Sequence, residues 1–439
     1  MIIIRLRAGF EKRFKTGHPW VYSNELFEIP KGLVPGDLVE LRDAGGKFLG
    51  RGYANPHSLI SFRCLSRDAS VENPLSEEFI SECLLSSWRL RNQMGFDSFS
   101  YRLSYGEADS LPGLVIDRYR LADEGQVLVV QAHTAGMDRI CGQIIGILKS
   151  WNEKISKETR DPVSWNQTVV VLRNDLGVRK MEGLKEENPL VLYNPSNRDL
   201  KSILFKIRPI QPLFPNSSEA MVFESNLFDG QKTGFFLDQF SNIQLAYQRF
   251  EQLGVVLAGK SQERLKILDL CCYVGQWGTQ LSSQWVKKGI QVEVSGVDAS
   301  SSALEFAKKN TERVGAMFKP FKMDVLRGLE LLPSESFDII ISDPPALIKS
   351  RKDVGAGTHA YLQLNTQVFR LLKKGGAVIC CSCSALLDET SFEKTLGKAA
   401  QRNQALIQWV GRGSQSPDHP MLIEFPEGRY LKSWMGIKV

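Results

Sequence analysis

Residues 265–300 read LKILDLCCYVGQWGTQLSSQWVKKGIQVEVSGVDAS, and this stretch decides the fold. An apolar strand over 266–271 leads through a turn at Gly275 into a helix over 276–288. A second apolar strand follows over 291–297. Strand, helix and strand in this order are typical of a βαβ unit, in which the two strands lie parallel in one sheet.

The same alternation continues toward the end of the chain. Further strands are expected over 337–342, 377–382, 405–410 and 430–439, and further helices over 301–314 and 361–374. This pattern predicts an α/β fold with a parallel, doubly wound, Rossmann-like sheet. In such sheets ligands bind beyond the carboxyl ends of the strands, so we expect the functional residues there.

Four acidic residues stand at or just after successive expected strand ends: Asp269, Asp298, Asp324 and Asp343. An acid at the end of the second strand can accept both hydroxyls of a ribose, and one at the third can meet an adenine amine. The turn after the first strand lacks the Gly-x-Gly-x-x-Gly and Walker lysine patterns that bind phosphates. A single such acid is more often a surface or capping group, but four in succession indicate an adenosine-binding site.

Length and composition limit the class of protein. The chain has 439 residues, of which 43% are apolar and 24% charged, as in soluble proteins of two or three domains. The apolar run at residues 1–5 is far too short for a signal peptide, and no run approaches the roughly 20 residues of a membrane span. We therefore expect a cytoplasmic protein without a membrane partner.

The charge is mildly basic. The net charge is +6 and the pI about 8.8. Residues 1–70 contain eleven Lys and Arg against seven Asp and Glu, an excess of 11 − 7 = +4. This balance permits a nucleic-acid partner without establishing one, since an excess of this size also suits a solvated surface.

Three domains are expected. Residues 1–70 predict a small β-barrel, because short strands around 38–41, 47–53 and 59–65 are separated by Gly, Pro and Asn turns. A central α/β domain should occupy residues 75–210. Its elements are expected as a helix capped by Ser76 and running to about Met94, strands over 114–118, 127–132 and 168–173, and a helix over 137–151.

The third domain is expected over 211–439. A linker rich in Pro, Asn and Ser should lie over 209–218. A β-hairpin over 223–239 should then begin the domain, because Asp229-Gly230 is a hairpin turn signal.

The eight cysteines show no disulfide framework, and no histidines stand in pairs at ligand spacing, so we expect neither disulfides nor a metal. Cys271-Cys272 and Cys380-Cys381 are neighbours on expected strands, which suits small core residues. Cys383 differs, because it falls at a strand end beside the expected ligand crevice.

Several motifs extend from one end of the chain to the other: HPWVYS at 18–23, GRG at 50–52, YRL at 101–103, GEADSLPGL at 106–114, IDR at 116–118, VRKMEG at 178–183, GQKTGFFLDQ at 230–239, CSCS at 381–384, DHP at 418–420 and PEGRYLK at 426–432. With these motifs the whole chain resembles the bacterial class I methyltransferases that make 5-methylcytosine in 23S ribosomal RNA and carry an N-terminal PUA domain.

The resemblance implies a PUA-type RNA-binding barrel, an α/β linker domain and a class I methyltransferase domain that binds S-adenosylmethionine. The four strand-end acids occupy the positions of the family's motifs I to IV. The cofactor-binding residues it implies are Lys232, Thr233, Gly234, Phe236, Asp238, Gln239, Asp269, Cys271, Tyr273, Gly275, Asp298, Ala299, Asp324, Val325 and Asp343. The implied partner is RNA, most specifically 23S ribosomal RNA, and the oligomeric state stays open, with a homodimer as one option.

Cys383 and Asp343 are the predicted catalytic residues. Carbon 5 of cytosine is a poor nucleophile, and addition of a thiolate to carbon 6 activates it toward a methyl donor. Cys383 lies at a strand end and faces the same crevice as Asp343, which could bind the cytosine amine or polarise the ring near N3. The base that removes the carbon-5 proton is not identified, since His359 and Glu389 fit surface positions better.

Two other functions remain open. One is methylation of an RNA nitrogen, such as guanine N7, which needs no thiol; the other is RNA binding without catalysis. The family usually has Arg after Leu-Asp-Gln and often Lys and an aromatic after Asp-Pro-Pro, whereas this chain has Phe240 and Ala346-Leu347. The loop after the first strand is also poorer in glycine than in the family. Ala346 disfavours nitrogen methylation, because an aromatic there would stack on the base, and the four acids disfavour loss of catalysis.

Overall fold

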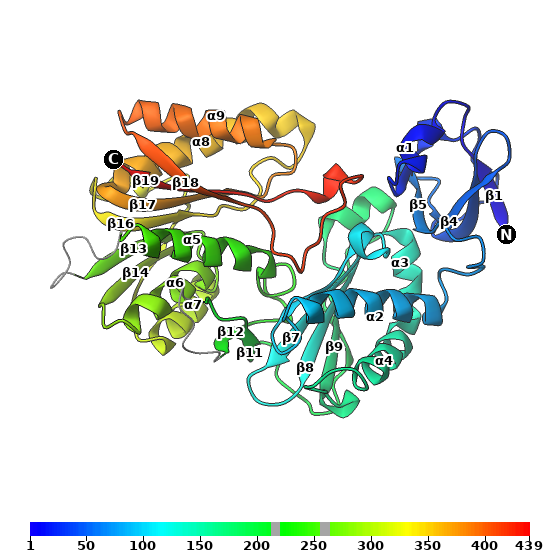
Figure 1. Cartoon of the computed structure of the whole chain (residues 1–439), viewed down its shortest axis with the longest axis horizontal. Coiled ribbons are helices and arrows are strands. Elements are labelled where there is room, and N and C mark those ends of the chain that lie inside the picture. Colours follow the sequence, from blue (N-terminus) through cyan, green and yellow to red (C-terminus); the bar gives the residue numbers. More distant parts are fainter. Residues whose placement is uncertain (212–219, 255–263) are drawn as a thin grey trace. The chain divides into compact units, whose positions relative to one another are not determined.

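The structure, a computed structural model, describes residues 1–211, 220–254 and 264–439. The linker expected over 209–218 therefore lies outside the described residues from residue 212 onward. Figure 1 shows the order of the helices and strands along the chain. No helix among the described residues is long and apolar enough to cross a membrane.

The backbone divides into two units, each built from three segments. The first unit comprises Met1–Ile207, Ser225–Leu237 and Pro417–Gly428, and the second comprises Arg208–Glu224, Asp238–Ser416 and Arg429–Val439. Two segments of the expected third domain thus belong to the first unit. The first unit contains both the N-terminal β module and the central α/β part.

The second unit is built on one mixed sheet. Its strands are β13 (Leu265–Leu270), β14 (Val292–Asp298), β15 (Met317–Lys322), β16 (Phe337–Ser342), β17 (Leu372–Ser382), β18 (Ile407–Gly413) and β19 (Lys432–Lys438). They lie in the order β15-β14-β13-β16-β17-β19-β18, and the pairs from β15 to β17 are parallel. The predicted α/β, doubly wound sheet is confirmed.

Strand β19 is antiparallel to both of its neighbours, β17 and β18. The alternation of strands and helices did not predict this arrangement. No α-helix lies between β18 and β19 in the stretch 414–431, all of which is described. Without a crossover helix the chain can return in the opposite direction and insert its last strand beside β17.

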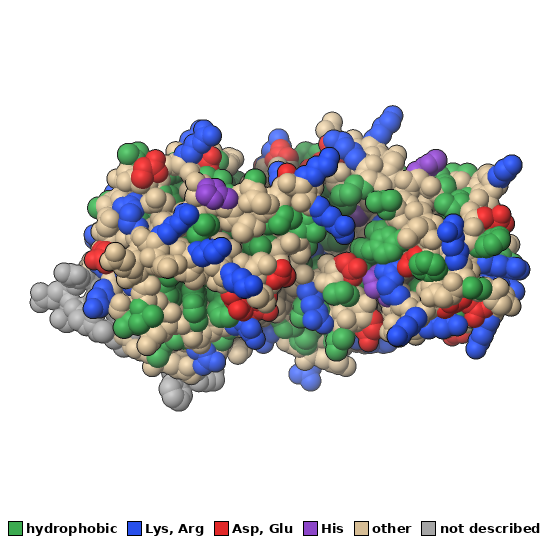
Figure 2. Space-filling view, turned by 90° about the horizontal axis from the view of Figure 1, so that it is seen from above, with side chains coloured by type: hydrophobic (Ala, Val, Ile, Leu, Met, Phe, Trp, Pro, Cys, Tyr) green, Lys and Arg blue, Asp and Glu red, His purple; other side chains and the backbone are tan. Residues whose placement is uncertain are grey.

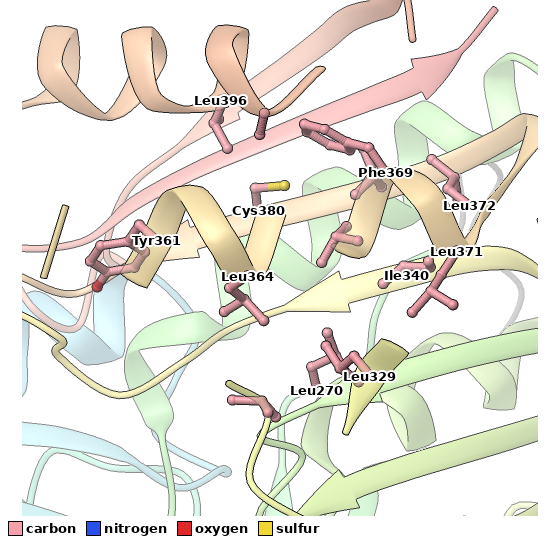
Figure 3. Packing of buried hydrophobic residues seen from close by; sticks show 14 of the residues in the cluster. Leu270, Leu329, Ile340, Tyr361, Leu364, Phe369, Leu371, Leu372, Cys380 and Leu396 are labelled. Carbon is pink, nitrogen blue, oxygen red and sulfur yellow. The ribbon is translucent and has the colours of Figure 1, made fainter. Parts of the chain in front are cut away.

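Helices cover both faces of this sheet (Figure 1). They are α5 (Phe240–Gln252), α6 (Gln276–Val286), α7 (Ser301–Arg313), α8 (Val354–Leu371) and α9 (Glu389–Arg402). Side chains of α8 and α9 pack with one face of the strands, and those of α5 and α6 pack with the other. Figure 3 shows part of the first cluster, in which the sulfur of Cys380 lies among aliphatic and aromatic side chains.

The N-terminal module of the first unit is a five-stranded sheet. Its elements are β1 (Ile2–Arg5), α1 (Glu11–Lys15), β2 (Trp20–Tyr22), β3 (Asp37–Arg42), β4 (Phe48–Ala54) and β5 (Ile60–Ser66), with strand order β1-β3-β4-β5-β2. Three of these strands were predicted. The outer strands β1 and β2 were not, since they are short and β1 is mostly exposed.

The central part of the first unit is a second mixed sheet flanked by helices. Its elements are α2 (Glu77–Gln93), β6 (Tyr101–Tyr105), β7 (Leu114–Leu121), β8 (Gln126–Ala132), α3 (Ala135–Ile140), α4 (Ile144–Ile155), β9 (Thr168–Leu172), β10 (Leu190–Tyr193) and β11 (Ile203–Ile207). As predicted, the Ser76 hydroxyl caps α2 by accepting from Phe79 N at 3.3 Å. The helix expected over 137–151 is instead two helices, separated by a 3-10 turn at Cys141–Gln143.

Buried polar contacts join the N-terminal module to the central part within the first unit. The carboxylate of Glu182 accepts from Arg63 at 2.9 Å and from the Ser58 hydroxyl at 2.8 Å. The Tyr53 hydroxyl donates to Pro112 O at 2.6 Å. Because such groups are costly to bury without partners, these contacts stabilise the packing of the module against the central part.

The hairpin expected over 223–239 is not formed. Only β12 (Met221–Ser225) is a strand, and residues 227–235 form turns and bends. Lys232 and Gly234 have φ angles of 50° and 110°, which interrupt an extended strand. The Thr233 hydroxyl donates to the buried carboxylate of Asp117 at 2.5 Å, and this contact fixes the turn.

Charges of both signs cover the surface. In the face shown in Figure 2, Lys and Arg side chains are interspersed with Asp and Glu side chains. Over the whole chain, 55 Lys and Arg against 49 Asp and Glu give the net charge of +6.

Candidate active site

The turn after β13 has an unusual backbone. Cys271, Tyr273 and Gly275 have φ angles of 58°, 48° and 79°. Left-handed conformations favour glycine, so the two larger residues, Cys271 and Tyr273, adopt them at a steric cost. A Cβ on Gly275 would lie 3.1 Å from Ala307 of α7, so the loop and α7 approach closely.

Asp269 lies in β13 and is 1% exposed. Its Oδ2 accepts from Gly278 N at 2.9 Å, near the N-terminus of α6. Burial raises the pKa of this carboxyl to about 7, although the Gly278 hydrogen bond lowers it; the nearby Asp343 and Asp298 raise it further. Its Oδ1 is buried and has no hydrogen-bond partner among the described residues.

Asp298 ends β14, where the ribose-binding acid was expected. Its Oδ2 accepts from Tyr273 N at 3.0 Å, and its Oδ1 accepts from Ser300 N at 2.8 Å. Each oxygen keeps a further lone pair, so the carboxylate is oriented and can still accept hydroxyl groups. The next residue, Ala299, is exposed, as is needed for contact with a ligand.

Asp324 and Val325 follow β15. Asp324 is exposed, and its Oδ1 accepts from Leu326 N at 2.9 Å, while Val325 is buried. Asp324 therefore stabilises its own turn, and its exposed carboxylate stands after the third strand as the sequence predicted.

Asp343 follows β16 and is held by two buried side chains. Its Oδ2 accepts from Gln239 Nε2 at 2.8 Å and from the indole Nε1 of Trp277 at 3.0 Å. Gln239 Oε1 in turn accepts from Asn242 Nδ2 at 2.7 Å. The chain Asn242, Gln239, Asp343 thus connects α5 to the end of β16 and fixes the carboxylate before a ligand binds.

All eight cysteines are free thiols, and four of them are buried: Cys64, Cys272, Cys380 and Cys381. Cys383 follows β17 and is half-buried. Its Sγ lies 3.7 Å from Pro344 O, the carbonyl that follows Asp343. The thiol and the Asp-Pro-Pro turn at 343–345 therefore lie together at the carboxyl ends of two adjacent parallel strands.

The loop that carries Cys383 is tied to its surroundings through Ser384. The Ser384 hydroxyl accepts from Ile348 N at 3.1 Å and lies 3.0 Å from the Tyr361 hydroxyl. Lys432 Nζ donates to Ser384 O at 2.7 Å and to Leu387 O at 2.8 Å. These bonds hold the residues on the C-terminal side of Cys383 in one conformation.

The remaining predicted cofactor residues divide between the two units. Asp238 belongs to the second unit, where its carboxylate accepts from the Tyr430 hydroxyl and its backbone oxygen from Ser416 N. Lys232, Thr233, Gly234 and Phe236 belong to the first unit, so the second unit's geometry does not include them. Thr233 is buried there, and the Lys232 ammonium lies 4.6 Å from the Phe236 ring centre.

Sequence reasoning missed several residues of this arrangement. Trp277 and Asn242 stand in no motif, so nothing in the sequence indicated their contacts with Gln239 and Asp343. Lys432 lies in the PEGRYLK motif, and that motif was the available signal. His359 and Glu389, for which surface positions were expected, are both exposed, and Glu389 pairs with Arg412 at 3.4 Å.

The residues present fit an adenosine-bearing cofactor. Asp298 presents an oriented carboxylate at the end of β14 beside a loop with left-handed backbone. Asp269 adds an acidic oxygen without a partner among the described residues, which a cationic group could satisfy. The two carboxyl groups are acidic, and the loop at residues 271–275 carries no positive charge. Both features disfavour a phosphate ligand.

Comparison with known proteins agrees with this geometry. Residues 4–67 match the PUA-like domain family, and residues 261–425 match a methyltransferase domain family. A solved structure from Streptococcus mutans, described as a SAM-dependent methyltransferase, covers 100% of both chains with a TM-score of 0.73 at 18% identity. A second methyltransferase structure, complexed with SAH, has a TM-score of 0.72 over the same coverage.

The sheet order, the acids at its strand ends and these matches define a SAM-dependent methyltransferase with the class I fold. A protein of Erwinia tasmaniensis named ribosomal RNA large subunit methyltransferase I is 30% identical over 98% of this chain and 97% of its own length. The protein of that name from Photobacterium profundum is also 30% identical, over 98% of each chain. The chain belongs to this family.

Proposed function

We propose that this enzyme methylates carbon 5 of a cytosine in large-subunit (23S) ribosomal RNA, with Cys383 as the nucleophile. The RNA class is supported by the relatives, whose name states that they act on large-subunit ribosomal RNA. The match of residues 4–67 to PUA-like domains supports an RNA-binding role for the module at residues 1–70. The activity is expected in the cytoplasm, where ribosomes are assembled.

The proposed cofactor site is built from the ends of β13, β14 and β15. Asp298 would accept the ribose hydroxyls, and Asp324 would meet the adenine amine. The loop from Cys271 to Gly275 would contact the methionine part, near the acidic Asp269. When bound, S-adenosylmethionine supplies an electrophilic methyl group.

The observation that carries the proposal is the position of Cys383. Its Sγ lies 3.7 Å from Pro344 O, so the thiol and the turn that begins with Asp343 border the same space. Cys383 is half-buried, whereas its neighbours Cys380 and Cys381 are at most 1% exposed. A thiol nucleophile must be accessible, and at this edge of the sheet Cys383 meets that condition.

The chemistry assigned to the chain's own residues has three steps. The Cys383 thiolate adds to carbon 6 of the cytosine, and the displaced electron pair makes carbon 5 nucleophilic. After methyl transfer a base takes the carbon-5 proton. The electron pair of that C–H bond restores the double bond, and the thiolate leaves from carbon 6. Asp343, fixed by Gln239 and Trp277, would hold the cytosine amine during these steps.

The target cytosine must leave its stack to reach this space, so a nucleotide in a loop or single strand is the expected target. Mass spectrometry of ribosomal RNA from cells with and without the protein tests the product and its position. A methylated guanine in place of 5-methylcytosine would support the nitrogen alternative, and an unchanged RNA would support binding without catalysis.

RNA that contains 5-fluorocytosine tests the nucleophile directly, since fluorine cannot leave as a proton does. The wild-type enzyme should form a covalent complex, and Cys383→Ala should not. Cys380→Ala and Cys381→Ala are matched controls, because both thiols are buried and should not affect trapping. Methylation at a near wild-type rate by Cys383→Ala would contradict the proposed mechanism.

A further inference from the structure

Lys432 begins strand β19 and lies directly across from Ser382 in the antiparallel pair with β17. Its Nζ crosses the end of β17 and donates to two backbone carbonyls, Ser384 O and Leu387 O, at 2.7 and 2.8 Å. These acceptors lie on the C-terminal side of Cys383. A single ammonium therefore holds two points of the loop that carries the thiol.

The charges that act on Lys432 come from three groups on two elements. Burial lowers the pKa of the Lys432 ammonium to about 8, and Cys383, Asp388 and Glu389 act in the opposite direction by their charge. Of these three, Cys383 has the largest effect and lies at the end of β17. Asp388 and Glu389 are exposed residues at the start of α9, so water screens their charge.

Other titratable groups face Cys383 itself. Tyr361 of α8 and Cys381 of β17 both interact with it electrostatically, and burial raises the pKa of each of these groups. Both are therefore neutral near pH 7. Lys432 differs from these two groups, because its ammonium brings a positive charge to the thiol.

We propose that Lys432 is a positioning residue for Cys383: it ties the thiol loop to β19 and places a positive charge beside the thiolate. This inference rests on the proposed function of Cys383. No hydrogen bond from Lys432 to Cys383 is needed, because the two carbonyls fix the ammonium while the charge acts through space.

A charge in this position has a consequence during the reaction. The thiolate is stabilised before it attacks, and the ammonium loses its counter-charge when the sulfur bonds to carbon 6. When the sulfur leaves carbon 6, the same ammonium again faces an anion. Lys432 would thus favour the free thiolate at both the start and the end of the covalent cycle.

The test measures the reactivity of Cys383 in the full-length protein without RNA. Iodoacetamide alkylates a thiolate when sulfur displaces iodide, and mass spectrometry of the Cys383 peptide gives the rate from pH 6 to 10. Lys432→Met keeps the length of the side chain and removes its charge. We expect the rate of Cys383 alkylation in this variant to fall roughly tenfold at pH 7.5. The midpoint of the pH profile of that rate should move about one pH unit higher, since a neighbouring opposite charge shifts a pKa by about 1–3 units.

Three further variants make the comparison specific. Lys432→Arg retains the charge and should keep the midpoint within about 0.3 units of wild type. Lys432→Gln is a second neutral variant, so the result does not depend on the folding of Lys432→Met. Lys438 is the matched control, because it is the last residue of β19 and its ammonium also donates to two backbone carbonyls, Phe369 O and Leu372 O. Lys438→Met should leave Cys383 alkylation unchanged.

An unshifted midpoint in a folded neutral variant overturns the inference. A second result would also overturn it: Lys432→Met keeps the wild-type midpoint of Cys383 alkylation but accumulates a covalent complex with ordinary cytosine RNA. That result would assign Lys432 to removal of the carbon-5 proton instead. Failure of the proposed function has a different signature: Cys383→Ala would still methylate RNA, whatever the alkylation profile. The two failures are therefore distinguishable.

Discussion

The carboxylate of Asp343 accepts a hydrogen bond from the indole Nε1 of Trp277 at 3.0 Å, which joins the end of β16 to the first turn of α6. We predict that Trp277→Phe slows methylation while cofactor affinity changes little. The Phe ring keeps most of the packing, but a buried acceptor loses a donor, at a cost of roughly 1–2 kcal/mol of unfolding free energy. Urea unfolding and single-turnover methylation rates measure both effects.

Trp434→Phe is the control for this prediction. The Trp434 indole nitrogen is buried and has no hydrogen-bond partner among the described residues, so its removal breaks no such bond. If Trp277→Phe and Trp434→Phe have the same methylation rate, the Trp277 contact has no role in positioning Asp343.

Asp298→Ala should weaken S-adenosylmethionine binding by roughly 1–3 kcal/mol, because ribose hydroxyls would lose their acceptor. The loop would also lose the bond from Asp298 to Tyr273 N. Asp324→Ala should have a smaller effect, since Asp324 is exposed to water. Titration calorimetry checks both variants, and unchanged affinity in Asp298→Ala rules out the ribose assignment.

Asp269 predicts a dependence of stability on pH. Burial raises the pKa of Asp269 from 3.8 to about 7, so between about pH 4 and 7 the folded state holds a proton that the unfolded state has lost. The stability from this group is present below pH 4 and is lost as pH rises through 7. Asp269→Asn cannot ionise, so at pH 8 it should exceed the wild-type unfolding free energy by roughly 1–3 kcal/mol.

The comparison is made at two pH values without cofactor. The stability difference between Asp269→Asn and wild type should shrink at pH 4 and grow at pH 8. A difference that does not change with pH would show that Asp269 ionises normally in the folded protein.

Gly275→Ala should destabilise the second unit. Gly275 has a φ of 79°, and an added Cβ would lie 3.1 Å from Ala307. Gly289→Ala is the matched control, because Gly289 has a φ of 78° and nothing within 4 Å of the added atom. The control should lose about 1 kcal/mol from backbone strain alone, and Gly275→Ala about 1 kcal/mol more from the contact. If urea unfolding gives the same loss of unfolding free energy for both variants, the loop and α7 can move apart to accommodate the added methyl group without an energetic cost.

The exposed lysines of the N-terminal module should contribute to RNA affinity. Lys12, Lys31 and Lys47 are exposed, so phosphate groups can reach them. Replacing all three by Gln should lower the slope of log affinity against log salt by as much as about 0.9 for each lysine that contacts a phosphate. Lys308→Gln and Lys394→Gln in the second unit are controls. An unchanged slope in the triple variant would place RNA binding elsewhere.

Deleting residues 1–70 would be a poorer test of that role. The deletion removes Arg63 and Tyr53, whose contacts with Glu182 and Pro112 are buried within the first unit. The remaining carboxylate would be buried without its cation, which is strongly destabilising. Surface substitutions separate RNA binding from stability, and the deletion does not.

Much of the second unit could be predicted from the sequence, because strands β13, β14 and β16 are short apolar runs that alternate with helices. The same pattern places Asp298 and Asp343 at strand ends. The contact between Trp277 and Asp343 was not predictable, since it joins residues 66 positions apart through a side chain that no motif marks. The prediction of a hairpin over 223–239 was wrong for a similar reason. The Asp229-Gly230 turn signal is local, whereas the hydrogen bond from Thr233 to Asp117 joins residues 116 positions apart and fixes the turn.

The segment Pro417–Gly428 completes the first unit, although most of that unit precedes residue 208. Within this segment Asp418 provides its backbone oxygen to Arg91 at 2.8 Å and a carboxylate oxygen to Arg102 N at 2.9 Å. During synthesis on a ribosome, the hydrogen bonds of Arg91 and Arg102 to Asp418 therefore cannot form until nearly all of the second unit has emerged. Folding cannot finish unit by unit in chain order, and a single proteolytic cut cannot release either unit with all of its segments.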